Sequence, residues 1–81
     1  MKSWYLYVVQ CSDGSLYTGI TTDIKRRINE HNSGKGAKFT RGRKWTLIYK
    51  EKYKSKKEAI SREYYIKKNR SLRKKIKENY K

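Results

Sequence analysis

The chain has 81 residues, a length that allows one domain, residues 1–81, and leaves no room for a second. Hydrophobic residues make up 35% and charged residues 37%, so the core must be thin, while an aromatic content of 14% argues against a disordered chain. The single cysteine, Cys11, excludes an intramolecular disulfide and a multi-cysteine zinc site.

The charge balance points to a polyanionic partner. Lys and Arg number 23 against 7 Asp and Glu, a formal net charge of +16, which makes nucleic acid the expected partner. A basic membrane-surface protein is the alternative, but it would need a long helix with an apolar face, which the sequence does not show. Without a signal peptide or a long apolar run, we expect a cytoplasmic protein and no membrane partner.

Two strands joined by a tight turn are expected at the start of the chain. Residues 4–11 are rich in aromatic and β-branched side chains, and a second strand over residues 15–20 follows the turn sequence Ser-Asp-Gly. A two-residue loop would put Tyr7 and Tyr17 on opposite faces of this hairpin. A three-residue loop with Gly14 in the left-handed region puts both phenols on one face, and we favour this register on functional grounds.

A helix is predicted next, from a Thr22 N-cap to about Asn32, where Ser-Gly ends it. Asp23 suits the positive end of its dipole. At about 100° per residue, Arg27 and His31 fall in the same arc as the two isoleucines that must face the sheet. A cation and an imidazole are therefore expected on the inward side of this helix.

A basic, glycine-rich loop is expected over residues 34–44. It lacks the Gly-Lys-Ser/Thr ending of a phosphate-binding loop. An aromatic ring among five cations indicates a nucleic-acid contact, because bases stack on aromatic side chains, and a solvated loop is the alternative. The candidate nucleic-acid-binding residues here are Lys35, Lys38, Phe39, Arg41 and Arg43.

The second half of the sequence predicts a strand over residues 45–52 and a helix that begins at the capping box Ser55 to Glu58. This helix places Glu63 on its core stripe, which is costly unless the carboxylate is paired with a cation or bound to a metal. Residues 69–71 break the helix, and a last basic helix covers 72–80. Together the elements predict an α/β protein of the α+β type, a three-stranded antiparallel sheet flanked by helices in the order β-β-α-β-α-α.

The pattern resembles the GIY-YIG nuclease superfamily over roughly residues 3–76, and is most similar to its small single-domain bacterial members. Tyr5-Leu6-Tyr7 stands at the first triplet, without its glycine, and Tyr17-Thr18-Gly19 at the second. Arg27 follows at the spacing of the family arginine, His31 lies one turn later, and Glu63 stands at the metal-binding glutamate. The family asparagine has no secure equivalent, since Asn69 is the sole nearby candidate.

The resemblance implies a metal-dependent endonuclease of low intrinsic sequence specificity, with DNA ahead of RNA as substrate and a role in repair or recombination. It implies one Mg²⁺ or Mn²⁺ on Glu63, and Gly19 and Lys67 among the residues that contact nucleic acid. His31 suits a base or proton relay near neutral pH. The implied catalytic set is Tyr7, Tyr17, Arg27, His31 and Glu63.

Two other functions stay open from the sequence. A non-catalytic nucleic-acid-binding protein would keep the same fold and charge. A small basic ribosomal protein would also explain the charge, but it gives no reason for a carboxylate on the core stripe of a helix. The oligomeric state and any protein partner that supplies targeting are likewise open.

Overall fold

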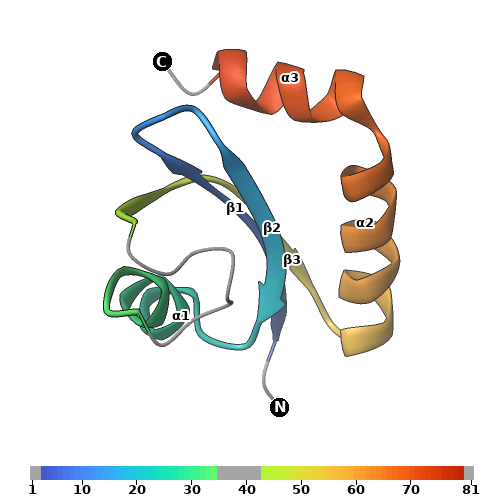
Figure 1. Cartoon of the computed structure of the whole chain (residues 1–81). Helices are drawn as coiled ribbons and strands as arrows, with labels where there is room; N and C mark the ends of the chain where they lie inside the picture. Colours follow the sequence, from blue (N-terminus) through green and yellow to red (C-terminus); the bar gives the residue numbers. More distant parts are fainter. Residues whose placement is uncertain (1–2, 35–42, 80–81) are drawn as a thin grey trace.

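The described residues form three antiparallel strands and three helices (Figure 1). The computed structural model of the chain describes residues 3–34 and 43–79. The strand order is β2-β1-β3, with β1 antiparallel to both neighbours. The predicted α+β fold and element order are confirmed. The elements are β1 (Trp4–Cys11), β2 (Leu16–Thr21), α1 (Ile24–Asn32), β3 (Trp45–Tyr53), α2 (Lys56–Lys68) and α3 (Arg70–Asn79).

The hairpin between β1 and β2 has a three-residue loop. The backbone N–H of Cys11 donates to the carbonyl of Ser15 at 2.9 Å, which closes the loop around the intervening residues. Gly14 has a φ of +93°, in the left-handed region that side chains disfavour. The resulting register places Tyr7 and Tyr17 on the same face of the sheet, so the register that we predicted is confirmed.

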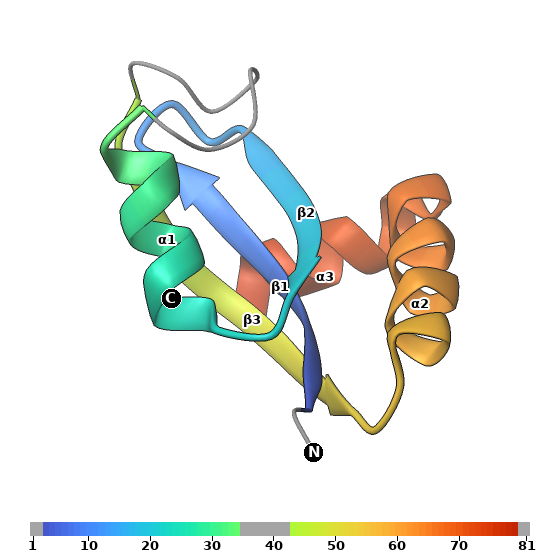
Figure 2. The same ribbon diagram turned by 90° about the horizontal axis from the view of Figure 1, so that it is seen from below.

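The helices cover both faces of the sheet, with α1 on one side and α2 on the other (Figures 1 and 2). On the α2 side the strand alternation places Leu6 and Val8, and α2 contributes Ala59 and Ile66, all four fully buried. The sheet therefore carries a thin core on each face. The core on the α1 side consists of Tyr7, Val9, Cys11 and Trp45, against which Tyr17, Ile28 and Leu47 pack.

Helix α1 begins one residue later than predicted. Its N-cap is Asp23, whose carboxylate accepts a hydrogen bond from the N–H of Arg26 at 3.1 Å, so the assignment of Thr22 as the cap was wrong. The residue that selects Asp23 as the cap is Thr21, just before Thr22. The hydroxyl of Thr21 accepts from the N–H of Asp23 at 3.1 Å and fixes the turn that precedes the helix. The predicted end is confirmed, with Ser33 as C-cap and Gly34 at a φ of +83°.

Helix α2 is fastened at its start and in its middle. Ser55 caps it as predicted, because its hydroxyl accepts from the N–H of Glu58 at 3.3 Å. Further along, the Arg62 guanidinium contacts both carboxylate oxygens of Glu51 on β3, at 3.0–3.3 Å. Asn69 ends α2, and its side-chain oxygen accepts from the N–H of Leu72, which caps α3 two residues earlier than predicted.

Candidate active site

The site begins with two phenols that the hairpin register brings together. The ring centroids of Tyr7 and Tyr17 lie 6.4 Å apart on the α1 face of the sheet. Tyr7 lies directly across from Gly19, and its ring passes over that residue. A Cβ atom at position 19 would lie 2.6 Å from the Tyr7 hydroxyl oxygen, closer than real Cβ contacts come. Glycine is therefore required at position 19 for the Tyr7 hydroxyl to occupy its place.

Helix α1 brings a guanidinium and an imidazole to the Tyr7 hydroxyl, as its predicted inward arc required. The hydroxyl oxygen lies 2.7 Å from Nε2 of His31, in a fully buried contact. Nε of Arg27 donates to the same oxygen at 3.4 Å. The ring of His31 also meets Tyr17 edge-on, at a centroid distance of 5.1 Å. Four of the predicted catalytic residues therefore converge on one point.

Within the described residues, one arrangement of these hydrogen bonds uses the Tyr7 hydroxyl as both acceptor and donor. Arginine has no acceptor atom, so the Tyr7 oxygen must accept from Arg27. The phenol then donates its own hydrogen to Nε2 of His31, provided that this nitrogen carries no proton. That tautomer makes His31 the proton acceptor of the pair.

Burial sets the protonation states of this cluster. Desolvation raises the pKa of Tyr7 to about 12, although the hydrogen bond from Arg27 opposes the rise. The pKa of His31 is lowered, first by burial and then by the Arg27 cation. At neutral pH, the phenol is therefore protonated and the imidazole neutral, which agrees with the hydrogen-bond arrangement.

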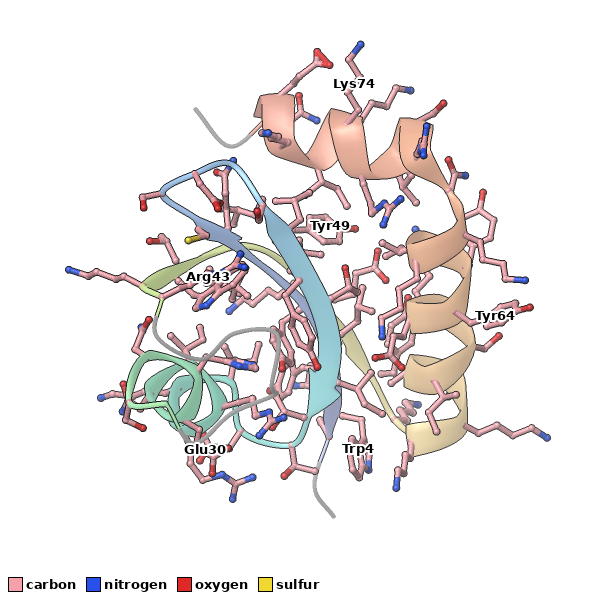
Figure 3. The ribbon with its side chains drawn as sticks, in the orientation of Figure 1. Trp4, Glu30, Arg43, Tyr49, Tyr64 and Lys74 are labelled. Atoms are coloured by element: carbon pink, nitrogen blue, oxygen red, sulfur yellow. The ribbon has the colours of Figure 1, made fainter. Side chains whose placement is uncertain are left out.

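Glu30 is a member of the site that sequence reasoning missed. Its carboxylate accepts from the Arg27 guanidinium at 2.9 Å, and Figure 3 shows it on α1. This contact raises the pKa of Arg27 and occupies one of the N–H donors of its guanidinium. The signal that could have found it was the three-residue spacing of the two residues, which is typical of a helical ion pair.

Glu63 lies on α2, the helix on the opposite side of the sheet from α1 (Figure 1). Its carboxylate lies 3.3 Å from Nζ of Lys67, one helical turn on, so the ion pair that the sequence left open is present. Nζ of Lys67 also lies 5.8 Å from the Tyr17 ring centroid. The negative charge of Glu63 contributes to the raised pKa of Tyr7. Glu63 is thus linked to Tyr17 through Lys67, and to Tyr7 through its charge.

The donor chemistry of Glu63 fits a magnesium-type ion. Among residues 3–34 and 43–79 there is no group of three His, Cys, Asp or Glu residues able to enclose a metal. Mg²⁺ is commonly bound by one or two carboxylates, with waters and substrate phosphates completing its shell. The side chain of Glu63 is 23% exposed and so is open to such an ion.

Only part of the predicted nucleic-acid-binding loop, residues 34–44, belongs to the described residues. Lys35, Lys38, Phe39 and Arg41 lie outside the described residues. Arg43 lies over the Trp45 ring, with 5.9 Å between its guanidinium carbon and the ring centroid, and pairs with Asp13 at 3.7 Å.

A second feature that sequence reasoning missed joins α1 to β3. The side chain of Asn32 accepts from the N–H of Trp45 at 2.6 Å and donates to its carbonyl at 3.1 Å. An amide at this position replaces a strand partner for the Trp45 backbone. It holds the end of α1, and with it His31, against the sheet. No local sequence pattern predicts a hydrogen bond between residues this far apart in the chain.

The chain belongs to the GIY-YIG family, since the model of the GIY-YIG catalytic domain matches residues 3–77. This is a nuclease-type domain, so membership indicates nuclease-type activity and nucleic-acid binding. Nucleases of this family generally depend on divalent metal ions. In the part of the chain that the structure describes, no helix has the length and apolar character needed to cross a membrane.

Similar proteins come from several microorganisms. A UPF0213 protein of Streptococcus agalactiae is 58% identical over 64 residues, covering 78% of this chain and 73% of its own. A UPF0213 protein of Halobacterium salinarum is also 58% identical, covering 78% of this chain and 83% of its own. The solution NMR structure of a UPF0213 protein from Bacillus halodurans matches with a TM-score of 0.57 and 46% identity, over 91% of this chain and 81% of that one.

Proposed function

We propose that this protein is a divalent-metal-dependent endonuclease that hydrolyses DNA phosphodiester bonds with little intrinsic sequence specificity. The observation that carries the proposal is the convergence of Arg27 and His31 on the Tyr7 hydroxyl, at 3.4 and 2.7 Å. Family membership supplies the reaction class, and the net charge of +16 supplies attraction to a polyanion.

We infer that a proton is relayed through Tyr7, and the hydrogen bonds of its hydroxyl to His31 and Arg27 support this role. A water oxygen attacks phosphorus while its proton passes to the Tyr7 oxygen, and the phenolic proton moves to Nε2 of His31. The P–O bond to the leaving oxygen breaks, and that oxygen takes a proton from solvent. With a pKa of about 12, free tyrosinate is rare at neutral pH. A relay avoids it, because the phenol gains one proton as it loses another.

The remaining residues bind and orient the phosphate. Arg27 keeps guanidinium N–H groups beyond those used by Tyr7 and Glu30, and these match the oxygens of a phosphate. Tyr17 borders the same point and can orient the attacking water or a phosphate oxygen. A divalent ion held by Glu63 would stabilise the negative charge that develops on the phosphoryl oxygens.

The deciding experiment is a cleavage panel on duplex, nicked, branched and single-stranded DNA, with and without Mg²⁺ or Mn²⁺. We expect metal-stimulated nicking by the wild type. Glu63→Gln should abolish nicking while DNA binding measured in EDTA stays nearly unchanged. Glu58→Gln is the matched control, because Glu58 lies on the same helix and its side chain contacts Ser55 at the N-cap.

A non-catalytic nucleic-acid-binding protein is the second candidate function. The ion pair between Glu63 and Lys67 and the raised pKa of Tyr7 favour it, since both oppose the roles that catalysis needs. Absence of metal-stimulated cleavage by the wild type across the whole panel, with DNA binding intact, would establish this second function in place of the first.

A further inference from the structure

The outer face of α2 carries an exposed apolar surface that the proposed active site does not use. Among the described residues, the large hydrophobic side chains that are exposed are Ile60, Tyr64 and Tyr65, at 46%, 61% and 51%. All three belong to α2. Figure 3 shows Tyr64 projecting from this helix away from the sheet. We call these three residues the α2 aromatic face.

Each tyrosine of the α2 aromatic face has a cation near its ring. Nζ of Lys68 lies 4.6 Å from the ring centroid of Tyr64, and the guanidinium carbon of Arg62 lies 5.1 Å from that of Tyr65. The Arg62 guanidinium is itself fixed by two hydrogen-bonded oxygens of Glu51. Each cation contacts one ring, and more than half of the surface of each tyrosine remains exposed to a partner.

The surface beside these rings is hollowed on both sides of Tyr65. One hollow is lined by Lys57, Ser61 and Arg62 together with Tyr65. The next shares Ser61 and Tyr65 and continues past Tyr64 towards the start of α3. Consecutive residues point about 100° apart around a helix, so each ring offers a separate flat surface. Two planar groups could therefore stack there, one on each ring.

The charge around the α2 aromatic face selects the kind of partner. Residues 56–79 hold ten lysines and arginines against three glutamates, a net charge of +7. A second copy of the chain would bring two strongly cationic surfaces together at considerable electrostatic cost. An anionic partner with flat aromatic groups satisfies both the rings and the cations. Single-stranded nucleic acid combines these two properties in one molecule.

We propose that the α2 aromatic face binds single-stranded nucleic acid, with unpaired bases stacked on Tyr64 and Tyr65 and the phosphates facing the cations of α2 and α3. The surface lies across the sheet from α1, which carries Arg27 and His31 (Figure 2). It would hold an unpaired strand or end away from the bond that is cut. The inference rests on the nucleic-acid binding in the proposed function and is independent of cleavage.

The test is fluorescence anisotropy in EDTA at about 0.15 M salt, with a labelled oligo-dT of about 15 nucleotides and a blunt duplex of equal length. The double variant Tyr64→Leu/Tyr65→Leu keeps apolar bulk but removes the flat rings. We expect it to weaken oligo-dT binding about tenfold or more and duplex binding no more than about twofold. Tyr64→Phe/Tyr65→Phe should bind oligo-dT as the wild type does.

Three results would overturn the proposal. Unchanged oligo-dT affinity of the leucine variant would show that the rings do not stack on bases. Equal losses for the leucine and phenylalanine variants would assign the effect to the hydroxyl groups. A wild type that self-associates in sedimentation, with the leucine variant monomeric and equal in DNA affinity, would assign the face to a second copy. Because metal is absent throughout, none of these depends on whether the protein cuts DNA.

Discussion

The Tyr7 hydroxyl and Nε2 of His31 are hydrogen-bonded at 2.7 Å in a fully buried contact between residues 24 positions apart. Arg27 donates to the same oxygen from the helix that carries His31. The pair therefore links the central strand to α1 by a chemical contact as well as by packing. Its consequences can be measured both in cleavage and in folding.

If Tyr7 and His31 form one proton path, their removal should not be additive. Tyr7→Phe and His31→Gln should each lower the metal-dependent nicking rate by about 10²- to 10⁴-fold. The double variant should be no slower than the slower single variant, because either change already interrupts the path. Initial rates of plasmid nicking measure this. Tyr5→Phe is the matched control, a hydroxyl deletion on the same strand, and a fully multiplicative loss in the double variant would contradict the relay.

Folding stability should depend on pH through His31, the sole histidine of the chain. Burial, followed by the Arg27 cation, lowers its pKa below the usual 6.5, and Glu30 opposes this only in part. The unfolded chain therefore takes up a proton near pH 6.5 that the folded chain does not. The free energy of unfolding should fall as the pH drops below about 6.5, until the lower pKa of the folded state is reached.

Urea denaturation at pH values between about 5 and 7.5 tests this dependence. His31→Gln should flatten it in that window. Carboxylates with lowered pKa values, such as Glu51, act at more acidic pH and leave the window clear. Stability of the wild type that is constant or rises on acidification from pH 7 would show that His31 is not buried as a neutral group.

Gly19→Ala should damage the site through space alone. The added methyl would lie 2.6 Å from the Tyr7 oxygen, and that hydroxyl cannot yield without losing His31. We expect a loss of about 1–3 kcal/mol in the free energy of unfolding and at least tenfold slower nicking. Thermal denaturation and nicking rates measure the two effects. Gly34→Asn is the control, because no atom of the described residues lies within 4 Å of a Cβ at that position and asparagine tolerates its positive φ.

Two arginine–glutamate pairs among residues 3–34 and 43–79 should differ in how much they contribute to folding stability. Glu51 is 13% exposed in its pair with Arg62 and also accepts hydrogen bonds from the hydroxyls of Tyr49 and Tyr53. Glu51→Ala would leave these donors without their acceptor and should cost about 2–3 kcal/mol of stability. Glu30→Ala breaks a more exposed pair and should hardly change the melting temperature. Equal shifts for the two variants would mean that burial does not decide the effect.

Much of the architecture could be predicted because local chemistry dictates it. Gly14 is the turn residue able to take a positive φ without strain, and this decides the hairpin register and the common face of Tyr7 and Tyr17. Helical periodicity likewise placed Arg27 and His31 inward. The N-cap of α1 could not be resolved in this way, since Thr22 and Asp23 are adjacent cap formers and a contact with Thr21 selects between them.

The contacts that could not be predicted join residues far apart in the chain. Glu51 binds Arg62, which lies eleven positions away in the sequence, and Asn32 binds the backbone of Trp45, which lies thirteen positions away. Neither partner follows from periodicity or capping patterns, because the packing of α1 and α2 on the finished sheet creates both. The exposed rings of α2 were missed for a related reason. Helix α2 is only weakly amphipathic, so its sequence does not indicate which of its faces packs on the sheet.

The three-residue hairpin loop constrains how this protein can vary. Deleting one residue there would shift β2 by one position against β1, turn Tyr17 to the opposite face and remove Gly19 from beneath the Tyr7 ring. A surface turn ordinarily accepts length changes. Here the loop between Cys11 and Ser15 cannot be shortened without separating Tyr7 from Tyr17, so an affinity tag or fluorescent label belongs at a terminus and not at this tip.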